Sequence, residues 1–297
     1  MRKVQLQASG DSVTIQRLPG WITSARGETP EDVAFLSGAA LACLHLVVTD
    51  EKVPHDLWRA RLALGAAEAC AAFAGRREGS AKLRDALHLA RPGDQPGPAG
   101  EIVRQWRGAV SRPISAVNLG RALQGIPADR IAACLDAGRS ISPVDRAAGV
   151  LDAVLTDTPR AETAALILAD AALARSLGWQ HVLPLLASSL KPRDLRKGRD
   201  DLRLACHRSV VAAAGAAVGM AADLARRAAR LRAVVPKLRA KGAKGAVDLF
   251  LSQDALAPTA LAGIMADRAA RRFCDRLVEL GVLRELTGRD SFRLYGV

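Results

Sequence analysis

The chain has 297 residues, of which 49% are hydrophobic and only 3% aromatic, and its net charge is +13. A core of Ala, Leu and Val packs closely as helices and poorly as a β-sandwich, so we expect a mainly α protein. Five dispersed cysteines, without a C-x-x-C pair, argue against a disulfide framework or a zinc site, and we expect reduced core thiols.

The N-terminal third carries the first predicted elements. Residues 4–16 alternate polar and apolar side chains around Gly10-Asp11, which predicts a short N-terminal β-hairpin. Hydroxyl-proline pairs at Thr29, Ser142 and Thr158 predict helix starts, because the hydroxyl can cap free N–H groups and proline loses no hydrogen bond there. Helical spacing predicts helices over residues 31–48, 55–74, 80–90, 99–111, 128–137, 144–156 and 160–177, the last buried on most sides. The proline- and glycine-rich residues 91–100 predict a surface loop.

The excess positive charge is concentrated in one stretch. Residues 191–245 carry a net charge of +11, whereas residues 1–190 carry +2 and residues 246–297 are neutral. We expect one long helix, or two helices joined near Ser209, stopped or kinked by Pro236. One stripe of this region carries Arg226, Arg230, Lys237 and Lys241, which could contact phosphates. A solvated helix face explains such a stripe equally well.

The last residues predict a winged helix-turn-helix. Residues 247–251 and 255–261 are short helix candidates, and Asp267 is expected to cap a helix over residues 267–280 that ends at Gly281. Strand-like runs at residues 282–286 and 291–295 flank a turn with Arg289 at its tip, which would form the wing. We therefore expect three parts: a helical body of unknown function (1–190), a basic helical connector (191–243) and a winged helix-turn-helix (244–297).

The helix over residues 267–280 carries four arginines opposite its apolar stripe. Arginine is well suited to contact guanine and phosphate, so this face is expected to lie in the major groove of DNA. The wing arginines would reach the minor groove or the backbone. The candidate DNA-binding residues are Arg268, Arg271, Arg272, Arg276, Arg289, Arg293, Arg226, Arg230, Lys237 and Lys241. A structural cap or a dimerisation module of the same shape is the alternative, and the neutral charge of residues 246–297 favours it.

Several runs resemble a known family. They are Thr29–Asp32, Phe35–Ala40, Lys191–Leu195, Leu202–Cys206, Pro236–Gly242, Asp267–Arg272, Arg284–Arg289 and Phe292–Gly296. Over nearly its whole length the chain resembles an uncharacterised rhizobial-type family with a domain of unknown function (DUF1403-like), which implies no known activity. The C-terminal third is similar to a second uncharacterised family (DUF1612-like), usually described as carrying a helix-turn-helix. That similarity implies a separable nucleic-acid-binding module.

Recognisable catalytic signatures are missing from the sequence. It has no G-x-S-x-G, P-loop or G-x-G-x-x-G motif, and its five histidines are scattered, so we predict no catalytic residues, no metal site and no cofactor. The four tryptophans are interpreted as core or rim anchors rather than a base-stacking platform. No secretory signal is visible and the longest apolar run has thirteen residues, so we expect a cytoplasmic protein without a membrane partner.

These patterns favour a non-catalytic protein that binds nucleic acid, namely double-stranded DNA, as a transcriptional regulator or plasmid accessory factor. One alternative is a protein-interaction scaffold whose winged helix mediates assembly. Another is an enzyme whose site in the helical body has no recognisable motif. The oligomeric state stays open, with a homodimer among the alternatives.

Overall fold

The computed structural model describes residues 14–24, 27–88, 96–136 and 142–297, and this part of the chain is mainly α-helical. Its α-helices are α1 (Gly20–Ser24), α2 (Pro30–Val48), α3 (His55–Phe73), α4 (Ser80–His88), α5 (Gly97–Val110), α6 (Ala116–Ala122), α7 (Ala128–Asp136), α8 (Pro143–Asp157), α9 (Glu162–Ser176), α10 (Leu186–Ser189), α11 (Arg199–Val234), α12 (Ala243–Phe250) and α13 (Asp267–Glu279). Three 3₁₀ turns, η1 (Asp194–Arg196), η2 (Val235–Lys237) and η3 (Pro258–Leu261), and two short strands, β1 (Arg284–Glu285) and β2 (Tyr295–Gly296), complete the described elements.

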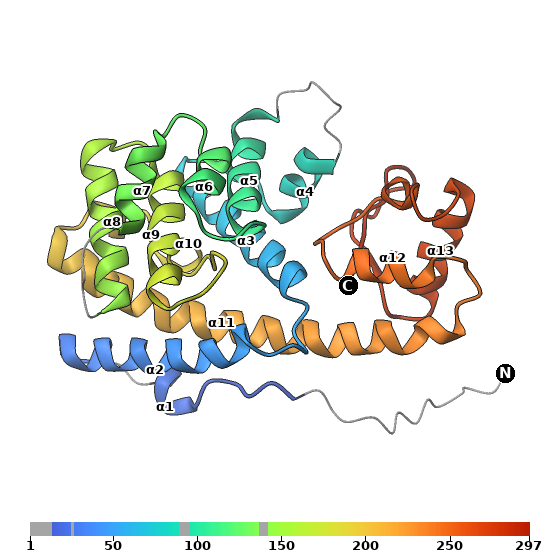
Figure 1. Cartoon of the computed structure of the whole chain (residues 1–297), viewed down its shortest axis with the longest axis horizontal. Coiled ribbons are helices and arrows are strands. Elements are labelled where there is room, and N and C mark those ends of the chain that lie inside the picture. The colour runs from blue at the N-terminus through green and yellow to red at the C-terminus, as the bar shows by residue number, and fades with distance from the viewer. Residues whose placement is uncertain (1–13, 25–26, 89–95, 137–141) are drawn as a thin grey trace.

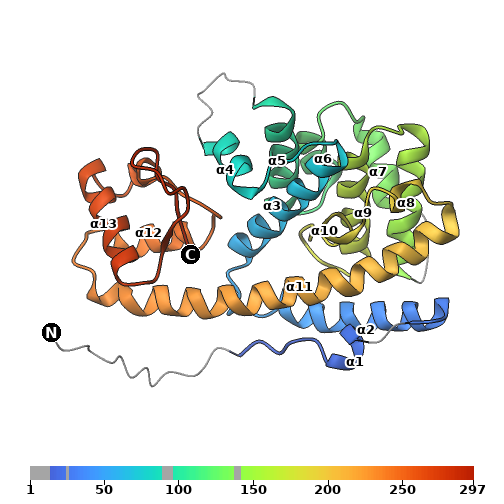
Figure 2. The same ribbon diagram turned by 180° about the vertical axis from the view of Figure 1, so that it is seen from behind.

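Helix α11 runs the length of the molecule, and the other elements are arranged along it (Figures 1 and 2). Helix α2 lies beside its first half, α3–α10 stack above that half, and α12 and α13 rise beside its second half. We call residues 243–297 the C-terminal lobe and the rest of the assembly the helical body. A 36-residue helix is roughly 54 Å long, so α11 is long enough to contact both the body and the lobe.

Small residues let α11 lie close to its neighbours. Ala213, Ala214, Ala217 and Ala221 are buried in its middle, and α2 and α8 pack against it. The predicted basic region is thus one uninterrupted helix through Ser209, and it gives way to a 3₁₀ turn at Pro236, which cannot donate an i→i−4 hydrogen bond.

Two of the three predicted proline-marked helix starts are confirmed. The Thr29 side chain accepts a hydrogen bond from the Asp32 N–H (3.1 Å), and Ser142 accepts one from the Asp145 N–H (3.2 Å). The third prediction is wrong, because Thr158 ends α8: its N–H donates to the Val154 carbonyl, and α9 begins only at Glu162. Thr158 completes the last turn of one helix instead of starting another.

Two other boundaries differ from expectation. The predicted loop 91–100 overlaps the start of α5 at Gly97, because Pro98 occupies the first turn, where its missing N–H costs nothing. Residues 91–95 of that loop, and all but the end of the predicted N-terminal hairpin, lie outside the described residues. Helix α6, which was not predicted, is capped by Ser115, whose side chain accepts from the Asn118 N–H.

Three of the four tryptophans are core anchors, as interpreted from the sequence. The Trp58 indole N–H donates to the Ala217 carbonyl of α11 (3.0 Å), and the Trp106 indole donates to the Cys70 sulfur (3.3 Å). Trp179 donates to His45. Trp21 is the exception, since it is 52% exposed and stacks on Phe35.

Two segments of the described chain are long and apolar enough to cross a membrane, by length and composition only: Pro30–Val48, and Arg199–Lys237, which contains α11. The core helices of globular proteins pass the same test, and 56% of the α11 window is buried inside the protein.

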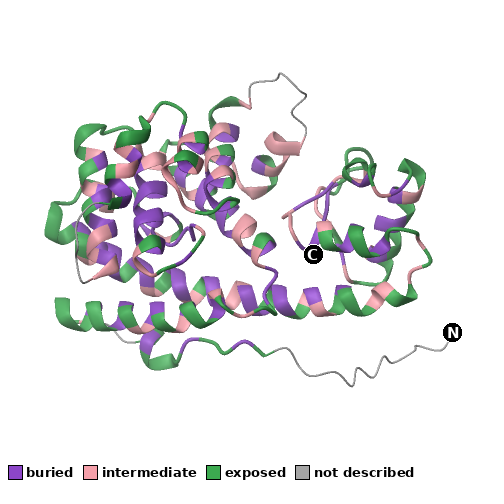
Figure 3. Ribbon diagram, in the orientation of Figure 1, coloured by how far each residue is buried: buried purple, intermediate pink, exposed green. Residues whose placement is uncertain are grey.

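The centre of the body is α9, which Figure 3 shows buried along most of its length, as predicted from its apolar circumference. Its one buried acid, Asp170, accepts hydrogen bonds from the N–H groups of Leu185 (3.2 Å), Leu186 (2.9 Å) and Ala187 (3.4 Å). These N–H groups belong to the start of α10, so Asp170 caps α10 from a neighbouring helix.

Burial raises the pKa of Asp170 from 3.8 to about 7, although the three N–H donors lower it. The folded state therefore holds this proton more tightly than the unfolded chain. Protonated Asp170 therefore adds to the free energy of unfolding. This contribution is largest below about pH 4 and is lost as the pH rises toward 7, by up to about 1.4 kcal/mol per pH unit.

We predict that Asp170→Asn, which cannot titrate, removes this slope. Urea unfolding of both proteins at about pH 4 and about pH 7 should show that the free energy of unfolding of the wild type, relative to the variant, falls as the pH rises. A wild-type-to-variant difference that stays constant over this range would contradict the assignment.

Candidate functional site

The C-terminal lobe is built around a small antiparallel pairing. Strand β1 pairs with β2, Glu285 opposite Tyr295, and Tyr295 also forms a β-bridge with Leu256 through mutual hydrogen bonds of 2.8 and 2.9 Å. Three separate segments of the lobe therefore meet at Tyr295. In chain order the elements of the lobe are a helix, an extended segment, a 3₁₀ turn, a second helix and a hairpin.

Two sequence predictions for this lobe are corrected. Residues 255–261 do not form a helix, because Leu256 enters the β-bridge and only Pro258–Leu261 form a turn of 3₁₀ helix. Asp267 does not cap α13 either: Ala266 is the N-cap, and Asp267 lies in the first helical turn, where it pairs with Arg271 at 2.9 Å. The end of α13 is as predicted, since Gly281 follows it with a φ of 68°, which favours glycine.

Helix α13 turns one face to the core and another to solvent. Ala270, Phe273, Cys274 and Leu277 are buried, whereas Leu280, the last residue of the predicted helix, is 37% exposed. The four predicted arginines, Arg268, Arg271, Arg272 and Arg276, are all exposed.

These four arginines differ in their partners. Arg276 pairs with Glu279 (2.9 Å), and Arg271 with Asp267. Within the described residues Arg268 and Arg272 form neither an ion pair nor a hydrogen bond, so two guanidinium groups one helical turn apart are available to a ligand.

The predicted wing folds back toward the body. The Arg289 guanidinium pairs with Asp85 of α4, and the Arg293 Nε–H donates to the Arg289 carbonyl (2.9 Å). Between them Phe292 has a φ of 56°, unusual for a non-glycine residue, and is 74% exposed. The hairpin tip thus combines two engaged arginines with an exposed aromatic ring.

The basic residues of α11 reach the lobe at one place. Arg230 and Arg227 line a small cleft with Arg284 of β1 and with Gly281 and Val282, which follow α13. Arg226 pairs with Asp223 on its own helix. Lys237 and Lys241 are exposed beyond the end of α11.

A partly buried ion-pair cluster fastens the lobe to the body. Asp254 accepts hydrogen bonds from the Arg84 Nε–H (2.5 Å) and Nη2–H (3.2 Å) and also pairs with Arg61. The Arg61 Nη2–H donates to the Val297 carbonyl (3.0 Å). A Cβ on Gly296 would lie 2.7 Å from the Asp254 carbonyl oxygen, so this close approach requires glycine.

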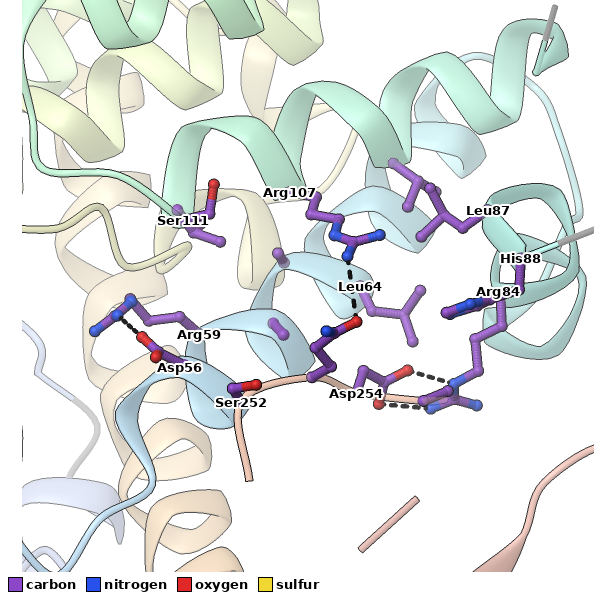
Figure 4. Close-up of a pocket in the computed structure, with 16 residues that line it drawn as sticks. Asp56, Arg59, Leu64, Arg84, Leu87, His88, Arg107, Ser111, Ser252 and Asp254 are labelled. Atoms are coloured by element: carbon purple, nitrogen blue, oxygen red, sulfur yellow. Dashed lines mark hydrogen bonds and ion pairs between the residues drawn. The ribbon is translucent and has the colours of Figure 1, made fainter. Parts of the chain in front are cut away.

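Beside this cluster lies a cavity of about 290 Å³ at the junction of body and lobe (Figure 4). We call it the junction cavity. Helices α3, α4 and α5 and the segment 252–255 line it, with an apolar floor that includes Leu64 and Leu87 and a polar rim of Arg59, Arg84, Arg107 and His88. This cavity was not predicted from the sequence, because each arginine lies on a different element and no motif spacing connects them.

A second constellation that was not predicted joins α2, α8 and α11. His207 Nδ1 lies 2.6 Å from the Ser37 hydroxyl, and His207 Nε2 lies 2.9 Å from Asp145 Oδ1. The three residue types are those of a hydrolytic triad, but the two ring nitrogens are exchanged, since in the triad serine contacts Nε2 and aspartate contacts Nδ1. In addition, Ser37 is only 1% exposed and its hydroxyl also lies within hydrogen-bonding distance of the Ala34 carbonyl (2.8 Å), so a substrate carbonyl cannot reach it. We interpret the constellation as a polar link between three helices.

The fold therefore defines a mainly α protein with a small C-terminal α/β lobe. The model of the family described as "Protein of unknown function (DUF1403)" matches residues 6–297, and the chain belongs to this family. A comparison with curated proteins finds no match. Within the described residues, no group of three or more His, Cys, Asp or Glu side chains is placed to hold a metal ion.

We predict that Asp254→Asn loosens the lobe. The substitution leaves Arg61 and Arg84 without their shared carboxylate, and breaking a largely buried ion pair costs about 3 kcal/mol. Hydrogen exchange should accelerate at the Leu256 and Tyr295 N–H groups more than in α9. Asp223→Asn, which removes the exposed partner of Arg226, is the control and should change neither region. Equal protection at Leu256 and Tyr295 in Asp254→Asn and wild type would contradict the role of this cluster.

We predict that Ser37→Ala destabilises the body by about 1–3 kcal/mol, because it leaves His207 Nδ1 buried without a partner. The matched control is Ser209→Ala on α11, which removes an equally buried hydroxyl whose hydrogen bond to the Leu186 carbonyl is long, 3.5 Å. Urea unfolding should show the larger decrease in stability for Ser37→Ala. Equal decreases would mean that the hydrogen bond to His207 contributes nothing specific.

Proposed function

We propose that residues 244–297 form a winged helix-turn-helix and that the chain is a non-catalytic, cytoplasmic protein that binds double-stranded DNA. Transcriptional regulation or an accessory role on a plasmid would fit such a protein. The observation that carries the proposal is the exposed arginine face of α13, on which Arg268 and Arg272 have no partner within the described residues.

The order of elements supports the winged-helix assignment. A helix (α12), an extended segment at Leu256, a short turn of helix, the helix α13 and a hairpin follow one another, and the extended segment joins the hairpin at Tyr295. A helix-turn-helix places its second helix in the major groove. As part of the same assignment, we propose that the C-terminal third is related to a second, DUF1612-like helix-turn-helix family.

This assignment gives the other two parts of the chain separate roles. Residues 1–190 would be the body and 191–243 the basic connector, whose α11 reaches the lobe beside Arg284. Arg226, Arg230, Lys237 and Lys241 would add phosphate contacts that do not depend on sequence.

The wing would contribute differently from the sequence prediction. Arg289 is already paired with Asp85, so a DNA backbone would have to compete for it. Phe292 is exposed at the same tip, and apolar side chains of minor-groove proteins insert between base steps. We therefore assign the wing contact to Phe292 as well as to Arg293.

A second candidate function is protein assembly through the same lobe. The docking of the hairpin on α4 and the zero net charge of residues 246–297 favour it. Salt separates the two candidates, because DNA affinity falls steeply with salt in proportion to the phosphates contacted, whereas an apolar assembly interface does not.

We predict that the double variant Arg268→Glu/Arg272→Glu binds a labelled DNA duplex of mixed sequence at least 10-fold more weakly than wild type, since each hydrogen bond to a charged group is worth about 1.5–3 kcal/mol. Fluorescence anisotropy at low salt measures the affinity. The slope of log affinity against log salt should become shallower by about 2, one for each phosphate that the variant no longer neutralises.

The control for this prediction is Arg112→Glu/Arg121→Glu, which makes the same charge change on exposed residues of the body, one just after α5 and one in α6. Its affinity should stay close to that of wild type. If both double variants bind equally weakly, the binding depends on overall charge alone, and the assignment of α13 as the recognition helix is wrong.

A further inference from the structure

The junction cavity is amphipathic. Its floor is apolar, with Ala63, Leu64 and Val103 buried among α3 and α5, and Leu87 of α4 closes one side (Figure 4). The polar groups are confined to the rim. A ligand that fits such a cavity has one polar end and an apolar remainder.

The charges around the cavity leave a positive excess. Asp56 is paired with Arg59, and Asp254 is shared by Arg61 and Arg84, so two carboxylates face three guanidinium groups here. Arg107 adds another positive charge, because its one contact within the described residues is a long hydrogen bond of 3.5 Å to the Gln253 side-chain oxygen. The cavity is therefore suited to an anion.

Arg107 is placed to bind that anion. It extends from α5 toward the apolar centre, above Leu64, in Figure 4. His88 stands on the same rim and makes no hydrogen bond within the described part of the chain. Burial, together with the nearby positive charge of Arg107, lowers the pKa of His88, so the ring is neutral at pH 7 and can donate one hydrogen bond.

We propose that the junction cavity binds a small organic monocarboxylate, with the carboxylate on Arg107 and an apolar carbon skeleton over Leu64 and Leu87. Arginine binds carboxylates through two parallel N–H donors, which a 3.5 Å hydrogen bond to a neutral amide does not match. A cavity of about 150 Å³ can hold benzene. The volume of about 290 Å³ therefore accommodates an aromatic ring together with its carboxylate.

The occupant would touch both parts of the protein. Ser252, Gln253 and Asp254 line the cavity and lead directly to Leu256, whose bridge to Tyr295 holds the lobe together. Binding should therefore stabilise the docking of the lobe on α3–α5. This coupling does not depend on what the lobe itself binds.

Isothermal titration of the full chain tests the proposal with benzoate and 3-phenylpropanoate as probes. Benzamide is the uncharged counterpart, and inorganic phosphate is an anion without an apolar part. We expect at least one carboxylate to bind with a Kd below about 1 mM. Benzamide and phosphate should bind at least 10-fold more weakly.

Two variants locate the site. Arg107→Gln removes the charge, and Ala60→Phe fills the cavity without changing any charge; each should weaken carboxylate binding at least 10-fold. Arg104→Gln, on the same helix but exposed and paired with Glu101, is the matched control and should bind as wild type does. Hydrogen exchange at the Leu256 and Tyr295 N–H groups should slow when the carboxylate is added.

Several results would overturn the proposal. They are no binding of either carboxylate up to about 10 mM, equal binding of benzoate and benzamide, or unchanged binding in both Arg107→Gln and Ala60→Phe. If Arg107→Gln does not fold, Ala60→Phe and the amide comparison decide the question. DNA affinity plays no part in these readouts, so failure here and failure of the proposed DNA binding are distinguishable.

Discussion

The carboxylate of Asp254, held between the guanidinium groups of Arg61 and Arg84, fastens the C-terminal lobe to the helical body. This cluster is largely desolvated, and burial lowers the pKa of Arg61, so the charges must remain paired for the junction to hold. The same three residues set the position of the segment 252–255, which closes the junction cavity and continues into the β-bridge at Leu256.

Helix α11 supplies the second constraint. Its buried alanines let α2 and α8 pack closely against its first half, and its second half carries Arg227 and Arg230 to the base of the hairpin. The lobe is therefore attached to the body at several places: by Asp254 on α3–α4, by Arg289 on Asp85 of α4, and by Arg227 and Arg230 of α11. A rotation of the lobe would have to break one of these attachments.

Much of the fold could be predicted from the sequence because it depends on local chemistry. The caps at Thr29 and Ser142, the buried circumference of α9 and the glycine that ends α13 all lie within one helical turn of the residues that cause them. Thr158 misled the prediction because a hydroxyl followed by proline is compatible with the end of one helix as well as with the start of the next. Residues 255–261 misled it because their pairing partner, Tyr295, lies far along the chain.

The candidate sites divide in the same way. The arginine face of α13 could be predicted because its residues recur with the period of a helix. The junction cavity and the Ser37–His207–Asp145 link could not be predicted, because each brings together residues from separate helices. The cavity also relates the two ends of the molecule thermodynamically. A ligand that contacts both α5 and Gln253 must favour the docked position of the lobe. By linkage, a second ligand that favours the docked position must raise the affinity of the cavity for the first ligand by the same factor. The same holds for the partner of the lobe, whether that partner is DNA or another protein. If the partner binds the docked lobe and the undocked lobe with different affinities, its binding would change the affinity of the cavity for its ligand.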